Sequence, residues 1–200
     1  MFRRAAVLLA VVAAMLGPRS IVGAAEPIVQ LLLQAADVPA ASARVIIKPR
    51  LLDSDSVDPY GVRGLEGAQF MYALFAAGAN KSKDQPLWNL MGDVYRAPDE
   101  NGSKRLFAMG KKTGIGFESK GTAFGGQIKS VALPAYGDEQ FACTANHSTY
   151  GEAAMVFVRK GTVVWTLQVE PGLGSHPTEA QMVEVLKTYA PKQQARVGAG

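Results

Sequence analysis

Two apolar runs, Ala153–Val158 and Val163–Val169, flank a short turn that contains glycine. Runs of this length, rich in β-branched and aromatic residues and separated by such a turn, are typical of a β-hairpin. With Lys160–Gly161 as a two-residue turn, Val158 faces Val163, and one surface of the hairpin is wholly apolar. Because a two-stranded hairpin cannot bury such a surface by itself, the chain must form a larger sheet covered by other elements.

The opposite surface of the hairpin is mixed, because apolar side chains alternate there with Thr166 and Gln168. We expect this surface to be only partly covered. Exposed apolar side chains on a sheet are candidates for ligand contact, and the candidates here are Met155, Phe157 and Val164.

Further segments extend the pattern towards both ends of the chain. Helical spacing or helix-start signals predict helices at 27–36, 98–110 and 177–189, and Thr178 with Gln181 forms a potential capping box in the last of these. Residues 69–75 and 87–95 read as strands, whereas 48–67 and 110–126 read as loops. Helices at both ends with hairpin-linked strands between them predict an α+β sandwich, an antiparallel sheet with helices packed mainly on one face.

The amino terminus predicts a cleavable export signal over residues 1–25. Arg3 and Arg4 precede the apolar run Ala5–Leu16, and small residues at 22–25 present a cleavage site. The run is shorter than the roughly 20 residues that span a bilayer. We therefore expect membrane contact only through the signal, a periplasmic or extracellular location, one domain over 26–190, and a disordered tail at 191–200.

Composition argues against a nucleic-acid partner. The whole chain has a formal charge of +4, but without the three arginines of the signal 18 basic residues stand against 17 acidic ones. A basic stretch between Lys104 and Lys129 could meet an anionic surface, but a solvated helix face is the better interpretation. Cys143 is the only cysteine and lies in a predicted strand, so a buried apolar role is favoured over a reactive thiol.

Catalytic, metal and cofactor signatures are weak. The glycine-rich segments miss the phosphate-binding and dinucleotide patterns, and we expect no cofactor and no metal. The enzyme alternative is a secreted hydrolase in which Asp138 and Glu139 act with His147, although eight or nine extended residues separate these groups by roughly 25 to 30 Å. The other histidine, His176, reads as part of a helix entry.

Four short segments are similar to small exported or lipid-anchored bacterial domains with the PsbP-like α+β sandwich. They are Leu31–Pro39, Val94–Pro98, Tyr136–Glu139 and Val156–Gly161. The resemblance covers residues 28–190 and implies a binding or accessory role without a reaction. The chain lacks a lipid-anchoring cysteine. We therefore expect a non-enzymatic extracytoplasmic module whose partner is a small apolar ligand or an unknown protein.

Overall fold

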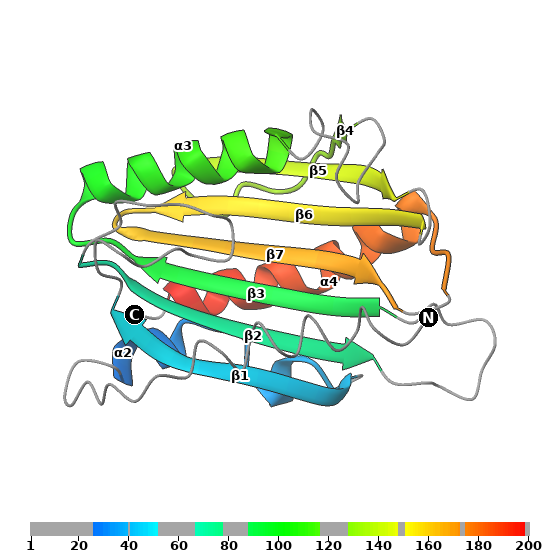
Figure 1. The fold of residues 1–200 in the computed structure, drawn as a ribbon, viewed down its shortest axis with the longest axis horizontal. Coiled ribbons are helices and arrows are strands. Elements are labelled where there is room, and N and C mark those ends of the chain that lie inside the picture. Colours follow the sequence, from blue (N-terminus) through cyan, green and yellow to red (C-terminus); the bar gives the residue numbers. More distant parts are fainter. Residues whose placement is uncertain are drawn as a thin grey trace, which may run out of the picture.

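The computed structural model describes residues 26–39, 41–51, 67–77, 88–116, 128–147, 151–172 and 175–198. Within these ranges seven strands form one antiparallel sheet in the order β1-β2-β3-β7-β6-β5-β4 (Figure 1). This confirms the predicted α+β class. The strands are β1 (Ala41–Leu51), β2 (Gln69–Ala77), β3 (Trp88–Arg96), β4 (Ile128–Ser130), β5 (Glu139–His147), β6 (Gly151–Lys160) and β7 (Val163–Pro171). The helices are α2 (Glu26–Gln30), the 3-10 helix η1 (Ala35–Asp37), α3 (Glu100–Gly116) and α4 (Glu179–Gly198).

The predicted hairpin is present as β6 and β7, but its register differs from the prediction. Lys160 pairs with Val163, so the two-residue turn consists of Gly161 and Thr162. Gly161 has a φ of 56°, and glycine with positive φ at the first turn position suits a type II′ turn. The predicted register was therefore wrong by two residues. Because two is an even number, every side chain still lies on its predicted face.

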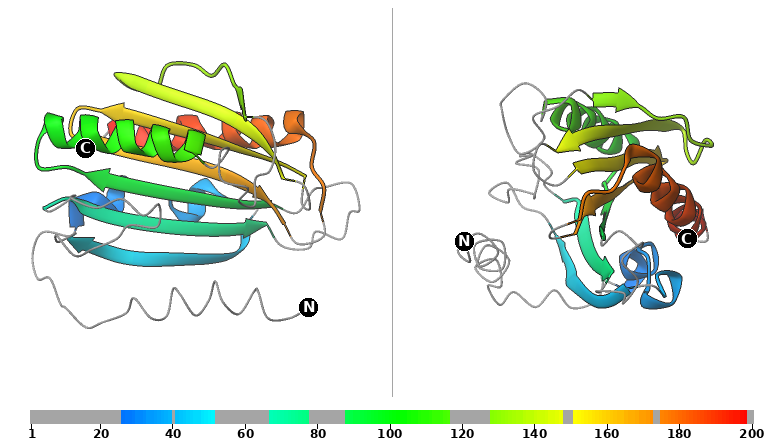
Figure 2. Two further views of the ribbon diagram at one scale, coloured as in Figure 1. Left: turned by 45° about the horizontal axis from the view of Figure 1, so that its top comes forward. Right: turned by 90° about the vertical axis from the view of Figure 1, so that its right-hand side faces the viewer.

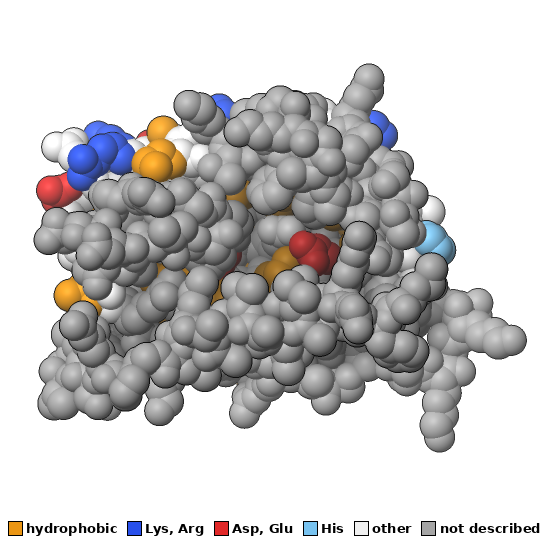
Figure 3. Space-filling model, viewed as in Figure 1, with side chains coloured by type: hydrophobic (Ala, Val, Ile, Leu, Met, Phe, Trp, Pro, Cys, Tyr) orange, Lys and Arg blue, Asp and Glu red, His pale blue; other side chains and the backbone are white. Residues whose placement is uncertain are grey.

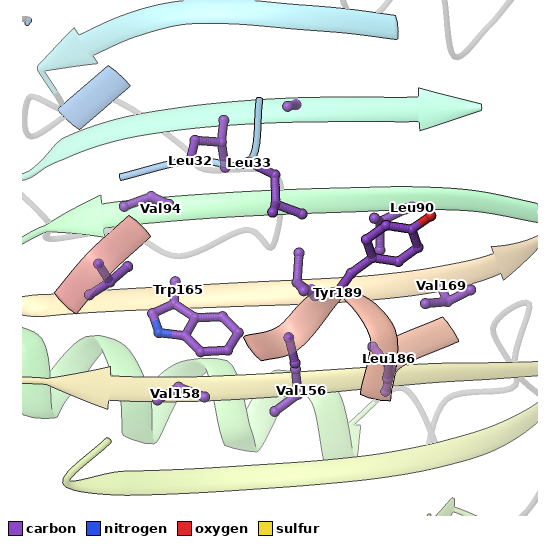
Figure 4. Packing of buried hydrophobic residues seen from close by; sticks show 14 of the residues in the cluster. Leu32, Leu33, Leu90, Val94, Val156, Val158, Trp165, Val169, Leu186 and Tyr189 are labelled. Atoms are coloured by element: carbon purple, nitrogen blue, oxygen red, sulfur yellow. The ribbon is translucent and has the colours of Figure 1, made fainter. Parts of the chain in front are cut away.

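Helices cover both faces of the sheet. Helices α2 and α4 lie on one face and α3 lies on the other (Figure 2). On the first face, α4 packs on β5, β6 and β7, while α2 packs on β2 and β3. The main core lies between these layers, and Figure 4 shows Trp165 and Val156 of the sheet close to Leu186 and Tyr189 of α4.

Helix α3 closes a second, smaller apolar cluster on the opposite face. Leu106 and Phe107 of the helix join Phe70, Tyr95 and Phe157 of the sheet in this cluster. The helix can approach the sheet closely because Gly110 has no side chain; a Cβ atom there would lie 2.9 Å from the ring of Phe157. The helix continues past Gly110 to Gly116, so the loop predicted for 110–126 is wrong up to residue 116, and 117–126 lie outside the described residues.

Two other boundary predictions need correction. Residues 48–51 belong to β1 rather than to a loop; Pro49 lies at a register shift between Ile47 and Arg50, on an edge strand where proline is tolerated. Residues 52–66 lie outside the described residues. The predicted disordered tail is also wrong up to residue 198, because α4 runs through Pro191 to Gly198.

The two terminal helices differ in how well they match the prediction. The predicted capping box of α4 is confirmed, because Thr178 N donates to Gln181 Oε1 at 2.7 Å and Gln181 N donates to Thr178 Oγ1 at 3.3 Å. The predicted helix at 27–36 is instead the five-residue α2 followed by η1. No helix among the described residues has the length and apolarity needed to cross a membrane.

Candidate functional site

The three ligand-binding candidates of the hairpin are buried. Met155, Phe157 and Val164 are 5%, 4% and 3% exposed, respectively, and all three belong to the cluster beneath α3. The expectation that this part of the surface is only partly covered is therefore wrong. No local pattern indicates that α3 lies on this face rather than beside the other helices.

The same face of the sheet carries polar groups farther from α3. In Figure 1 the helix lies along the β5–β6 side, and β2 and β3 are clear of it. Tyr72, Asp93 and Thr166 occupy neighbouring positions on β2, β3 and β7. Thr166 Oγ1 donates a hydrogen bond to Asp93 Oδ2 at 2.9 Å, and Asp93 is only 1% exposed. A buried carboxylate thus lies in the middle of the sheet.

A second carboxylate lies farther along β7. Glu170 is opposite Asn89 of β3, and Gln168 Nε2 donates a hydrogen bond to Glu170 Oε1 at 2.7 Å. Burial raises the pKa of Glu170, and the hydrogen bond from Gln168 offsets only part of this rise. Figure 3 shows acidic and apolar side chains near one another close to the centre of this face.

The two acidic residues also affect the pKa of Tyr72. Burial raises the pKa of Tyr72, and the negative charges of Asp93 and Glu170 raise it further. The phenol therefore stays protonated at neutral pH and can donate a hydrogen bond, whereas the carboxylates accept. We call Tyr72, Asp93, Thr166, Gln168 and Glu170 the polar site.

Sequence reasoning missed the polar site because its members come from three strands. Only the alternation of Thr166, Gln168 and Glu170 with apolar residues in β7 marked a polar row. Asp93 stands between Leu90–Gly92 and Val94–Tyr95, and an acidic residue within such an apolar stretch was the available signal for an unusual buried carboxyl group. Its alignment with Tyr72 and Thr166 depends on the order of the strands in the sheet. No local sequence pattern predicts that order.

The structure does not bring together the groups of the hydrolase alternative. Arg159 lies 3.2 Å from Asp138 Oδ2 and 2.6 Å from Glu139 Oε1, so both carboxylates hold the β6–β7 turn. Glu139 pairs with Arg159 at one end of β5, and His147 pairs with Gly151 at the other. Eight extended residues separate these ends by about 26 Å.

The thiol and two of the basic side chains that the sequence singled out are buried or paired. Cys143 is fully buried in the cluster beneath α3, which confirms its predicted burial. Lys129 of the basic stretch lies 2.6 Å from Glu179, and Lys104 lies 4.0 Å from Glu100. Among the described side chains, no group of three or more histidine, cysteine, aspartate or glutamate residues is arranged to hold a metal ion.

Comparisons with known proteins give a fold but no family. No protein-family model matches the sequence, and no curated protein matches it. The chain is similar in structure to the extracellular domain of PknH from Mycobacterium tuberculosis, with a TM-score of 0.50 and 12% sequence identity. The match covers 90% of this chain and 100% of that domain. At this identity, the likeness shows that the two chains share a fold.

Proposed function

We propose that this protein is an exported, non-enzymatic binding module whose ligand contacts the polar site on the α3 side of the sheet. The observation that carries the proposal is the placement of Asp93 and Glu170 on one sheet face, beyond the part that α3 covers. Keeping the Glu170 carboxylate at such a buried position costs stability. A binding role is a reason for a chain to keep it there.

The chemistry of the polar site favours a ligand that donates hydrogen bonds. The site offers carboxylate oxygens from two strands, and Leu74 and Met91 are cross-strand neighbours on the same face. A small molecule with hydroxyl or amino groups and an apolar part would match both kinds of contact. This moves the proposed site from Phe157 of β6 to Glu170 of the neighbouring strand β7, and it replaces a wholly apolar ligand with an amphipathic one.

The location of the module is proposed from two supports. Residues 1–25 carry the pattern of an export signal, and the structural neighbour is itself an extracellular domain. A non-enzymatic role is favoured for a separate reason. Asp138 and Glu139 form salt bridges with Arg159 and lie at the opposite end of β5 from His147. The resemblance to PsbP-like domains, whose roles are mostly accessory, agrees with this proposal.

The proposal can be tested by NMR titration with a panel of small probes. The panel contains alkylammonium ions, amino sugars and neutral polyols, with alkylcarboxylates as the negative set. Donor-bearing probes should shift the amide signals of β3 and β7 in the unmodified protein, and Glu170→Gln should weaken this binding about tenfold or more, as expected for a charged hydrogen-bond partner.

Glu184→Gln is the matched control, because Glu184 is an exposed carboxylate on α4 that pairs with Lys187. This variant should bind like the unmodified protein. The proposal fails if no donor-bearing probe perturbs β3 and β7, or if Glu170→Gln binds every probe as well as Glu184→Gln does.

A further inference from the structure

The segment before β1 is deeply buried although it has little regular structure. We call residues 28–38 the strap. Ile28, Leu32 and Leu33 are fully buried, yet the strap contains only part of the five-residue α2 and the three-residue η1. Helices this short are not stable alone. The strap therefore depends on what it packs against.

One buried glutamine of α4 binds the backbone of the strap. Gln193 is 0% exposed; its Oε1 accepts a hydrogen bond from Leu33 N at 3.1 Å, and its Nε2 donates to Leu31 O. One amide side chain thus satisfies a donor and an acceptor that no strand or long helix pairs. Leaving such groups buried without partners costs about 1–3 kcal/mol for each.

Two basic residues of the same helix end hold the far end of the strap. Arg196 Nε donates to Asp37 Oδ2 at 3.0 Å, and Arg196 Nη2 donates to Asp37 Oδ1 at 3.1 Å. Lys192 Nζ donates to the carbonyl oxygen of Asp37 at 2.7 Å. All of these contacts come from the part of α4 that follows Pro191.

The last turns of α4 depend in turn on the strap. Pro191 has no N–H group, so it removes one hydrogen bond from the interior of α4 and weakens the helix at that point. The turns beyond it contact the strap through the buried Gln193 and the half-buried Arg196, and Val197 packs in the main core. The strap and the last turns of α4 therefore stabilise each other.

We propose that the strap and residues 192–198 form one conformational unit, the latch, which closes after the sheet has formed. The hydrogen bond from Leu33 to Gln193 joins residues that are 160 positions apart. Closing so long a loop is entropically costly until the sheet brings its ends together. The strap also needs the sheet as a surface, because Leu32 Cδ1 lies against Gly92 of β3.

Late closure of the latch keeps the segment next to the predicted signal undocked, a consequence that rests on the proposed export. The strap follows directly after the predicted signal, whereas its partners lie near the other end of the chain. A chain whose C-terminal turns are not yet available leaves the strap undocked and the main core open on that side. The segment next to the signal thus remains extended until the rest of the chain can fold.

Hydrogen exchange on the full chain tests the latch. In pulse labelling during refolding, amides of the strap and of 192–198 should gain protection together, in a phase after those of β6 and β7. In the native state, Gln193→Leu should speed exchange of the strap and of 194–198 by about 10- to 100-fold, the range for one lost buried hydrogen-bond partner, while β6 and β7 change little.

Arg196→Met provides a second variant at a half-buried site and should give a smaller, parallel effect. Lys187→Met, on the exposed side of α4 before Pro191, is the control and should change neither region. The proposal is overturned if the strap becomes protected in the same phase as β6 and β7. It is also overturned if Gln193→Leu accelerates exchange equally throughout the sheet, or leaves the strap unchanged. Loss of probe binding at the polar site would not affect any of these results.

Discussion

At the scale of single residues, the α3 side of the sheet is divided between apolar packing and buried charge. Phe157 lies beneath α3 against Gly110, whereas Glu170 lies farther along the neighbouring strand with Gln168 as its hydrogen-bond partner. The first residue contributes to stability by filling space. The second has a carboxyl group whose pKa is raised by burial, so its charge opposes folding.

Phe157→Ala should destabilise the protein by about 3–5 kcal/mol, because it removes a buried ring and leaves a cavity beneath α3. Chemical denaturation followed by circular dichroism would measure this loss. Lys160→Ala, at an exposed position at the end of the same strand, should change the free energy of unfolding by less than about 0.5 kcal/mol. A stable Phe157→Ala protein that had lost only ligand binding would instead restore Phe157 as a contact residue.

Glu170→Gln should stabilise the protein at pH 7. The pKa of Glu170 is higher in the folded than in the unfolded chain, for which the usual value is 4.5, so the unmodified protein loses stability as pH rises above about that value. The neutral amide avoids this loss and keeps an oxygen that accepts from Gln168. Denaturation at several pH values should show that Glu170→Gln has the larger free energy of unfolding at pH 7 and that this difference disappears below pH 4. An equal difference at pH 7 and below pH 4 would exclude titration of Glu170 as the cause.

At the scale of elements, the ion pair between Asp37 and Arg196 joins the strap to the last turns of α4 in addition to the hydrogen bonds of Gln193. Burial raises the pKa of Asp37, but hydrogen bonds from Arg196 and from the backbone of Gln34, together with the charges of Arg196 and Lys192, outweigh it. The net pKa lies below the usual value of 3.8. The stabilisation is thus fully present above that value and is lost as pH falls through the pKa of the folded state.

Asp37→Asn should lower the free energy of unfolding by about 1.5–3 kcal/mol at pH 7, the range for hydrogen bonds to a charged group. The difference from the unmodified protein should shrink below pH 3.8, where that protein also loses the charge. Urea denaturation between pH 2 and pH 7 would measure both. Glu184→Gln serves again as a control, since its carboxylate is exposed; the same pH dependence in this variant would contradict the assignment to Asp37.

At the scale of the whole molecule, one antiparallel sheet separates a large core from a smaller one. Helices α2 and α4 cover the large core and α3 covers part of the small one. The chain shares this fold with the PknH extracellular domain at 12% identity. The described domain begins close to the predicted cleavage site, because Ile28 is already buried in the large core.

Mass spectrometry of the exported protein should find a mature amino terminus at Ala25 or Glu26. Small residues precede both cleavage positions, as export peptidases require. The control is the same chain with Ala24 and Ala25 replaced by leucine, which should remain unprocessed. An intact Met1 terminus in a membrane fraction would contradict the prediction. Mild cross-linking of the same material would show whether the module has a protein partner instead of a small ligand.

The sequence by itself determined the local elements of this protein. The hairpin, the strands around Phe70 and Leu90, the capping box at Thr178 and the burial of Cys143 all follow from short-range patterns, because alternation and capping act within a few residues. Only the tertiary structure decided that α3 covers Phe157, that Asp93 aligns with Thr166, and that Gln193 continues a helix instead of beginning a tail. Each of these outcomes depends on contacts between residues far apart in the chain, and such contacts override local preference where burial supplies most of the free energy.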